Sequence, residues 1–474
     1  MSNLQVGVVG FDITPGFHPQ FGAWGTTPTM TELDMPLLAR CIAMRQGGQQ
    51  LLWFGSDLVG DSVPQTDKLR KEVADALNLE VPQVIWSTSQ THSSGAVPGS
   101  LLTGSSICEI GATDETFVEQ QWRRFIEAYI ESGREAINRL QPAQVWVGRG
   151  YCDSMSYNTR FPMPTGGVKF SRHHGEGLQS GKFFDPTIGL LRFDDLQGKV
   201  MGAIFNFCSH PATMVNNKCV SPDWVGTARQ LIEEEIGGAP AMFVQGMCGD
   251  VNCHHIFGTP AQAKRNGTKL GEAAVRALPH LMPVRSEPFT YDWRTIELPC
   301  RPMYTRQEID EALAARREFL EELKDDPSAT WFCGINAPDP MSVQEKTAFV
   351  QVQIDYLLEG LRILEAGETV RSSLPFTLGA IRIGDLAIAL SPGENFTATG
   401  RNIRTRSPFC FTLVCGDTNG LFGYIGDDDE IDRGGYETDS YWKMLYIDGF
   451  RLALAKGTVP KILSTANEML SDLQ

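Results

Sequence analysis

The chain of 474 residues is long enough for one large domain, or for two smaller ones, with a buried reaction site. Hydrophobic residues make up 42% and charged residues 21% of it, a globular composition that excludes disordered, collagen-like and coiled-coil proteins. The formal net charge of -16, without a cluster of Lys and Arg, opposes binding to nucleic acid or to an anionic membrane surface.

The sequence shows no targeting or membrane-spanning pattern. Residues 1–10 lack the basic start and apolar run of a signal peptide, and nowhere do about 18 apolar residues follow one another. We therefore expect a cytoplasmic protein without a membrane span. The 11 cysteines are odd in number and include no CxxC pair, so most of them are expected to be buried apolar residues and not disulfide partners or zinc-finger ligands.

Short apolar segments alternate with helical ones through the first half of the chain. Periodicity predicts strands at 5–9, 50–54, 83–88, 144–148, 187–193, 201–207 and 241–245. It predicts helices at 64–77, 116–140, 222–236 and 261–278, the third of them capped by Asp223. This alternation is typical of a layered α/β domain, here with a large mixed sheet.

The pattern changes after Pro283. A strand at 289–298 is followed by charged helices at 306–325 and 343–366, which we interpret as a helical insertion or subdomain at about 300–370 of a single domain, residues 1–474. Alternation returns at 374–390 and 409–415, and helices are predicted near 439–456 and 459–473. Residues 151–180, rich in Gly, Pro and Ser, are predicted to form a loop of the kind that lines functional sites.

Two of the eight histidines follow directly on apolar strands. His92 stands in a polar segment after the strand at 83–88, and His210 follows the strand at 201–207, which Pro211 ends. A lone histidine is usually a structural residue that forms a hydrogen bond within a turn. The matching position of these two at strand ends favours a functional site.

A carboxylate and two phenols occupy comparable positions further on. Glu394 leaves the strand that ends at Leu390, where the alternative role is a helix cap, and Tyr424 and Tyr436 lie in Gly-rich loops after the strand at 409–415. Two histidines, a carboxylate and a phenol oxygen form a tetrahedral donor set suited to zinc. A water molecule on that ion would ionise near pH 7 and attack a carbonyl group.

These segments resemble, in the same order, motifs of the neutral/alkaline non-lysosomal ceramidase family. The segments are residues 87–95, 208–213, 245–252 and 390–395, and further likeness is found at 6–15, 158–160, 184–186 and Tyr436. The resemblance spans nearly the whole chain. It implies the α/β fold of the ceramidase catalytic domain, with a large mixed sheet layered with helices and without that family's C-terminal immunoglobulin-like domain.

The resemblance also implies roles for individual residues. His210, Glu394 and Tyr424 fall on zinc-ligand positions, while Arg160 and Tyr436 match residues that hold the substrate and stabilise the oxyanion. The family's first strand-end histidine is Gln90 here, and only the second is present, as His92.

Residues 90 and 92 point to the same side, about 7 Å apart, if the segment stays extended, so a local shift would let His92 take the vacant position. The family's serine position in the Gly-Asp-Val-Ser segment is Asn252, which excludes a serine nucleophile there and favours activated water.

Two rival hypotheses remain open. Cys248, in a Gly-rich turn near His254 or His255, is a candidate nucleophile of a cysteine hydrolase. Alternatively, Gln90 and Asn252 mark a metal-free metabolite-binding protein that has lost catalysis. His173, His174, His254 and His255 are interpreted as exposed loop residues, with another metal site as the alternative.

The sequence therefore predicts a hydrolase that uses metal-activated water to cleave an amide, lactam, ester or lactone bond of a small polar substrate other than ceramide. Asp250 and Asp223 are candidates for orienting a ligand histidine, with turn or cap residues as the alternative. Enzymes of this size often dimerise, which leaves a homo-oligomer open. The predicted residues are His92, His210, Glu394 and Tyr424 for zinc, Gln90, Arg160 and Asn252 for substrate, and Arg160, Tyr436 and His92 for catalysis.

Overall fold

The computed structural model describes residues 4–15, 30–94, 115–164, 166–171, 180–215, 217–330, 342–444 and 449–474. His173 and His174, which the sequence marks as a histidine pair, lie outside the described residues.

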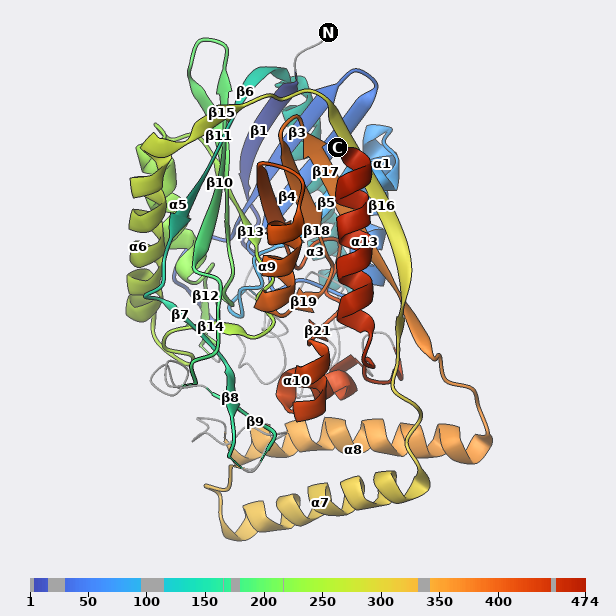
Figure 1. Ribbon diagram of the computed structural model, residues 1–474. Coiled ribbons are helices and arrows are strands. Elements are labelled where there is room, and N and C mark those ends of the chain that lie inside the picture. The colour runs from blue at the N-terminus through green and yellow to red at the C-terminus, as the bar shows by residue number, and fades with distance from the viewer. Residues whose placement is uncertain are drawn as a thin grey trace.

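Nine strands of the described chain form the larger sheet (Figure 1). Their order is β13-β11-β10-β6-β1-β3-β4-β5, with β15 also paired to β6. Most neighbours are antiparallel, but the pairs β4–β5 and β11–β13 at the two ends are parallel. The strands are β1 (Gln5–Asp12), β3 (Leu38–Gln46), β4 (Gln49–Ser56), β5 (Val84–Thr88), β6 (Gln141–Tyr151), β10 (Thr187–Asp195), β11 (Val200–Phe207), β13 (Ala241–Gln245) and β15 (Met282–Val284).

A four-stranded sheet packs face to face against the larger one. It runs in the order β16 (Phe289–Pro299), β17 (Ser373–Ile383), β18 (Leu386–Leu390) and β20 (Phe411–Cys415), and the pair β18–β20 is parallel. One continuous cluster of buried apolar side chains from both sheets fills the space between them. Two sheets packed face to face bury the apolar side chains of their inner faces. This removal of apolar surface from water is the main contribution of such a core to stability.

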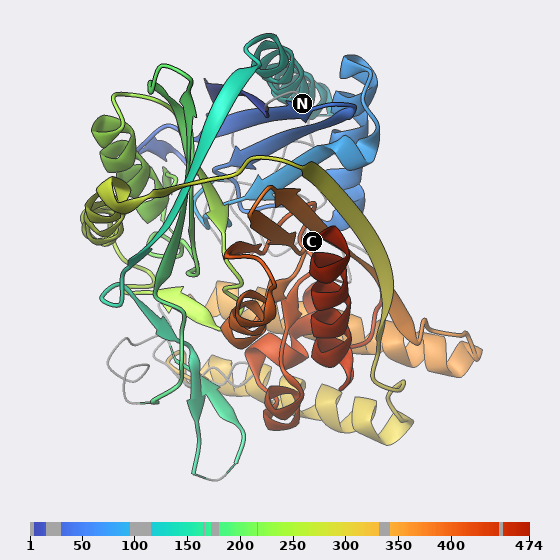
Figure 2. The same ribbon diagram turned by 45° about the horizontal axis from the view of Figure 1, so that its top comes forward.

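Helices cover the outer faces of both sheets, so the molecule has four layers (Figures 1 and 2). Two helices cover β3 and β4, two cover the β10–β11–β13 end of the large sheet, and two cover the small sheet. In that order they are α1 (Val63–Leu77), α3 (Glu115–Asn138), α5 (Trp224–Glu235), α6 (Pro260–Ala277), α9 (Thr397–Arg406) and α13 (Thr458–Leu473). The predicted α/β class with a large mixed sheet is confirmed.

A pair of long helices interrupts the small sheet between β16 and β17. These are α7 (Arg306–Asp325) and α8 (Val343–Ala366), which pack their apolar faces against each other. Trp442 and the partly buried ring of Tyr436 pack on the same cluster. Figure 1 shows the pair lying across the end of the molecule, next to the short helix α10 (Asp428–Arg433). The pair therefore supports the segment that carries Tyr436.

The predicted helix near 439–456 is wrong. The described part of this segment contains the end of α11 (Tyr436–Asp439) and a 3-10 helix at Ser440–Met444, followed by extended chain from Gly449. There, Ala453 accepts a hydrogen bond from the main-chain N–H of Arg301, and Ala455 donates one to Pro299. Pairing with the end of β16 and burial of the apolar residues at 452–454 have overridden a weak helical pattern.

Short strands complete the fold around the site. The short strands are β2 (Glu32–Leu33), β7 (Ser156–Asn158), β8 (Arg160–Pro162), β9 (Val168–Phe170), β12 (Cys219–Val220), β14 (Val251–Cys253), β19 (Glu394–Asn395) and β21 (Tyr424–Ile425), with 3-10 helices at Val81–Gln83 and Leu278–His280. Three of these strands, β7, β8 and β9, lie in the described part of the segment 151–180, which was predicted to be a loop.

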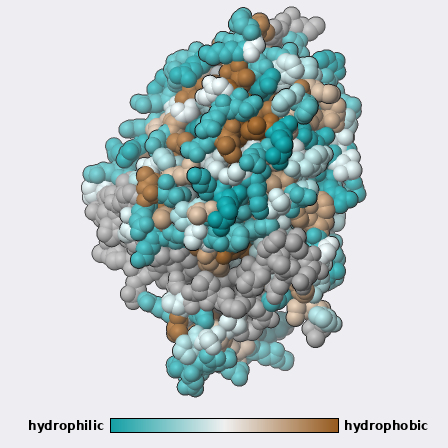
Figure 3. Space-filling model, turned by 90° about the vertical axis from the view of Figure 1, so that its left-hand side faces the viewer, coloured by the Kyte–Doolittle hydropathy of each residue, from teal (hydrophilic) through white to brown (hydrophobic). Residues whose placement is uncertain are grey.

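Among the described residues, the face drawn in Figure 3 is mainly hydrophilic, and its hydrophobic side chains form small separate groups. Such groups are normal on a folded protein and mark no extended apolar interface on the described part of this face. In the part of the chain that the structure describes, no helix combines the length and the hydrophobicity needed to cross a membrane.

Candidate active site at the carboxyl ends of three parallel strand pairs

Three parallel strand pairs direct their carboxyl ends to one region. The pairs are β4–β5, β11–β13 and β18–β20, joined through α1, α5 and α9 respectively. Gln245, the last residue of β13, connects these ends. Its side-chain Nε2 donates to the carbonyls of Ser89 and Ser209, and its main-chain carbonyl accepts a hydrogen bond from the Gly416 N–H. Polar loops that follow such strands are where α/β proteins usually bind ligands. We call the residues gathered here the strand-end site.

His210 is held in a fixed orientation at the centre of this site. Its Nδ1 lies 2.9 Å from the Val251 carbonyl, and its Nε2 lies 3.1 Å from Oε1 of Glu394. Because a carbonyl only accepts hydrogen bonds, Nδ1 carries the hydrogen and the Nε2 lone pair faces Glu394. Two acceptor atoms in contact need a proton or a cation between them.

Glu394 and Tyr424 are placed side by side by main-chain pairing. They face each other in the two-residue parallel ladder of β19 and β21. The loop after β13 packs directly on this ladder, since the Gly249 N–H donates to the Asn395 carbonyl over 2.9 Å. A Cβ atom at Gly249 would lie 2.1 Å from the Glu394 carbonyl oxygen, so only glycine permits this approach.

Two phenol rings extend the site from Glu394. The Tyr424 ring centroid lies 6.2 Å from that of His210 and 5.8 Å from that of Tyr436. Tyr436 begins α11, and its ring also lies edge-on against Phe170. Burial and the Glu394 carboxylate raise the pKa of Tyr424 above its ordinary value, so at neutral pH its hydroxyl is a hydrogen-bond donor unless a cation binds it.

His92 lies beside His210, although not for the predicted reason. Strand β5 ends at Thr88, and Gln90 has a left-handed backbone with φ of 63°, so residues 90 and 92 do not continue an extended strand. The main-chain N–H of His92 donates to the Pro211 carbonyl, and the rings of His92 and His210 are 6.2 Å apart. The half-buried imidazole of His92 is thus next to the strand-end site.

Gln90 and Cys248 form a buried contact at the inner side of the site. The Cys248 thiol lies 3.6 Å from the Gln90 Oε1, while Nε2 of the same amide has no hydrogen-bond partner within the described residues. Complete burial raises the pKa of Cys248 well above its ordinary value. The sulfur is therefore a neutral thiol at physiological pH, which opposes the rival hypothesis that Cys248 is a nucleophile.

Arg160 is buried and its guanidinium is largely used by the protein itself. Nε and Nη1 donate to the carboxylates of Glu430 and Glu437 over 2.5 and 2.7 Å, and Nη2 donates to the carbonyls of Glu430 and Gly434. Only one N–H, on Nη1, remains outside these bonds. Arg160 therefore fixes the segment 430–437, which carries Tyr436, and offers a substrate at most one donor.

Asp250 and Asp223 do not orient His210, and Asp223 takes the alternative role of a helix cap. Asp250 accepts from the Asn158 amide and the Thr397 N–H, and Asp223 accepts from the N–H groups of Met214 and Trp224, as a helix cap does. Neither carboxylate contacts the His210 imidazole, which a main-chain carbonyl orients instead.

Desolvation by burial raises the pKa of Asp250 to about 7 and that of Asp223 to about 6. Asn252, the predicted substrate residue, lies on β14 and forms a parallel bridge with His210. His254 follows that strand, donates its main-chain N–H to Met155 and lies beside the Tyr157 ring.

Asp417 is a buried residue of the site that the sequence predictions missed. It stands two residues after the end of β20 and is 1% exposed, and neither of its carboxylate oxygens has a hydrogen-bond partner within the described residues. Burial and the neighbouring Glu394 carboxylate both raise its pKa well above the ordinary value. Its position shortly after a buried strand, like that of His210, was the available signal.

The residues present fit part of a metal site. His210 Nε2 and Glu394 Oε1 are 3.1 Å apart, close to the separation of about 3.3 Å between two ligands of one tetrahedral zinc ion. Tyr424, paired with Glu394 in the β19–β21 ladder, supplies its phenol oxygen as a third candidate ligand atom. Across the described ranges, however, no three His, Cys, Asp or Glu side chains lie close enough to hold an ion. The fourth ligand is therefore the open question.

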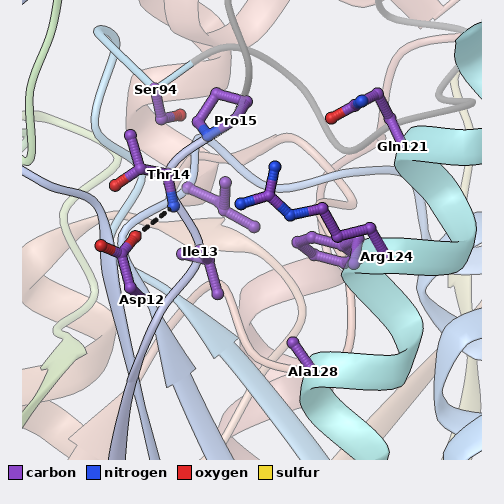
Figure 4. A pocket seen from close by; sticks show the side chains of 10 residues that line it. Asp12, Ile13, Thr14, Pro15, Ser94, Gln121, Arg124 and Ala128 are labelled. Atoms are coloured by element: carbon purple, nitrogen blue, oxygen red, sulfur yellow. Dashed lines mark hydrogen bonds between the residues drawn. The ribbon is translucent and has the colours of Figure 1, made fainter.

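A separate small pocket lies between β1 and α3 (Figure 4). Arg124 and Gln121 project from α3 toward the chain after β1, where the Thr14 N–H donates to Asp12. The cavity volume is about 50 Å³, far below the roughly 300 Å³ or more of a typical small-molecule site. None of the predicted site residues lines this pocket, so it adds nothing to the catalytic hypothesis.

Fold and site together define a four-layer α/β protein with imidazole, carboxylate and phenol groups at its strand ends. No protein-family model matches the chain. The neutral ceramidase from Pseudomonas aeruginosa has a similar structure, at 18% identity and a TM-score of 0.66 over 99% of this chain and 74% of that one. A ceramidase complexed with C2 also matches, at 18% identity and a TM-score of 0.68 over 99% and 75% of the two chains. The chain has the ceramidase fold, which confirms the predicted resemblance at the level of fold.

Proposed function

We propose that this protein is a metal-dependent hydrolase that cleaves an amide bond, or a related lactam, ester or lactone bond, of a small polar molecule. The observation that carries the proposal is the convergence of His210 Nε2 on Glu394 Oε1 at 3.1 Å, with two tyrosines next to them. The ceramidase names of the two similar structures support an amide as the first substrate class to test.

In this proposal His210, Glu394 and Tyr424 would hold a zinc ion, while His92, the predicted fourth ligand, is not within reach of the same ion in this structure. A divalent ion bound there would supply a Lewis acid that acidifies a water molecule and polarises a carbonyl group. The fixed tautomer of His210 serves this purpose, because Val251 binds Nδ1–H and leaves the Nε2 lone pair for coordination.

The proposal gives roles to the remaining polar groups near His210 and Glu394. Tyr436 donates its hydroxyl hydrogen to the oxyanion that forms on the substrate carbonyl. Arg160 holds the segment that carries Tyr436, and its remaining Nη1–H adds a second donor. The imidazole of His92, whose ring lies beside that of His210, would accept the proton of the attacking water and return it to the leaving amine. The products are a carboxylic acid and an amine.

Hydrolysis of a panel of N-acyl amines, lactams, esters and lactones tests this proposal. The purified chain is assayed as isolated, after chelation and after zinc is returned, beside Glu394→Ala and the control His280→Ala, whose histidine lies on an exposed 3-10 turn. We expect chelation and Glu394→Ala to abolish hydrolysis, and His280→Ala to retain it. Activity that survives chelation contradicts the proposal, and binding of a panel member without turnover supports the metabolite-binding alternative.

A further inference from the structure

Asp417 differs from other buried aspartates of this protein. Asp57 pairs with Arg229, and both Asp223 and Asp250 accept two hydrogen bonds each. The two carboxylate oxygens of Asp417, by contrast, have no hydrogen-bond partner in the described chain. Burying a carboxylate is costly unless it is paired, hydrogen-bonded or bound to a metal ion.

The loop that carries Asp417 is fastened inside the strand-end site. The Asp417 carbonyl accepts from the Thr88 N–H, and the N–H of Thr418 donates to the Ser391 carbonyl. These bonds place the residue between the ends of β5 and β18, the strands that lead to Gln90 and Glu394. Its backbone has φ of 44°, a conformation that a non-glycine residue adopts only at a cost.

Gln90 does not supply a strong metal ligand in the same region. Its Oε1 is the acceptor for the Cys248 thiol, and a neutral amide is not among the usual ligands of zinc. One acidic side chain without a hydrogen-bond partner among the described residues thus stands in a site where His210, Glu394 and Tyr424 are the candidate ligands. In the same part of the chain, no third His, Cys, Asp or Glu side chain lies within reach of an ion at His210 and Glu394.

We propose that Asp417 is a ligand of the metal ion in the strand-end site and supplies the donor that Gln90 does not. The inference rests on the proposed function, because it assumes an ion at His210 and Glu394. It requires the Asp417 carboxylate to turn toward that pair when the ion binds, since the three side chains are not within reach of one ion in this structure. A site with two carboxylates, a phenol and one imidazole is oxygen-rich and accepts Mn²⁺ better, relative to Zn²⁺, than a site with two imidazoles does.

Metal affinity tests the inference independently of activity. The full chain is stripped with a chelator, and its Zn²⁺ and Mn²⁺ affinities are measured by competition with a chromophoric chelator. The variants are Asp417→Asn, the double variant Gln90→His/Asp417→Asn, and the control Asp194→Asn. Asp194 is also buried, pairs with Arg192 and lies at the end of β10 away from the site.

We expect Asp417→Asn to weaken Zn²⁺ binding by more than the about 10- to 100-fold that loss of an outer partner costs. The double variant should regain Zn²⁺ affinity to within about tenfold of wild type and prefer Zn²⁺ over Mn²⁺ more strongly. Asp194→Asn should bind as wild type does. Without metal, Asp417→Asn should unfold at the same or a higher temperature than wild type, because a costly buried carboxyl has been removed.

Other results overturn the inference in distinguishable ways. If Asp417→Asn binds Zn²⁺ as tightly as wild type while His210→Ala does not, the proposed function stands and Asp417 is not a ligand. If Asp417→Asn unfolds earlier without metal and Gln90→His restores no affinity, Asp417 has a structural role. If wild type binds neither ion, the proposed function and the inference both fail.

Discussion

Replacing Arg160 by Met should loosen the segment that carries Tyr436. The substitution keeps much of the side-chain volume but removes four hydrogen bonds and leaves the carboxylate of Glu437, which is 1% exposed, without its cation. Breaking a buried ion pair by removing one partner costs about 3–5 kcal/mol. Glu430 keeps its contact with Lys182, which moderates the loss at that end.

Native-state hydrogen exchange measures this effect locally. The free energy of opening for amides at 430–439 should fall by about 3–5 kcal/mol in Arg160→Met, and kcat should fall while the metal content stays at the wild-type level. Combining Arg160→Met with Glu437→Gln should cost less than the sum of the two single changes, because the pair acts as a unit. Arg192→Met, which removes a half-exposed partner of Asp194, is the control. Unchanged exchange at 430–439 in Arg160→Met would refute the reasoning.

Three further changes probe other parts of the site. Gly249→Ala places a Cβ atom against the Glu394 carbonyl and should cost at least about 1–3 kcal/mol of stability together with activity; thermal unfolding equal to wild type would contradict the packing described. Asp223→Asn should remove the contribution of Asp223 to the pH dependence of stability. The pKa of Asp223 is about 6 in the native protein and 3.8 ordinarily, so between these pH values the native side chain binds more protons than the unfolded one. Its contribution to stability therefore falls as pH rises from about 4 to 6. Urea unfolding over this range should show a smaller fall in stability in the variant than in wild type, because Asp250 and Asp427, whose pKa values burial also raises, remain in both proteins. Cys248→Ser should keep most hydrolytic activity because the thiol is neutral and buried, and loss of activity with the metal still bound would return Cys248 to the mechanism.

Local periodicity predicted the fold class because most core elements are regular. The segments that became β11, β13, α5 and α7 carry clear apolar repeats, and Asp223 caps α5 as predicted. Strand β3 (Leu38–Gln46) escaped prediction since it combines two Arg residues with a nearly continuous buried run, and its position inside the sheet depends on pairing with β1 and β4. The segment near 439–456 failed for a related reason, as contacts with β16 determine its backbone.

The candidate site was predictable where a polar residue follows a buried strand. This rule found His92, His210 and Glu394, which come from separate parts of the chain and meet at the strand ends. The rule applies equally to Asp417, but a lone aspartate in a Gly-rich loop gives no sign that its carboxylate is buried. The four bonds of Arg160 were also beyond prediction, because they depend on how the segment 430–437 folds back over β8.

Metal content of the purified, unsupplemented protein tests the central claim most directly. Mass spectrometry of wild type, His210→Ala and the control His280→Ala gives the number of ions per chain. We expect about one divalent ion per chain in wild type and in the control, and a loss of that ion in His210→Ala. An ion that persists in His210→Ala, or its absence from all three proteins under conditions that load known zinc enzymes, would contradict a metal site at His210 and Glu394.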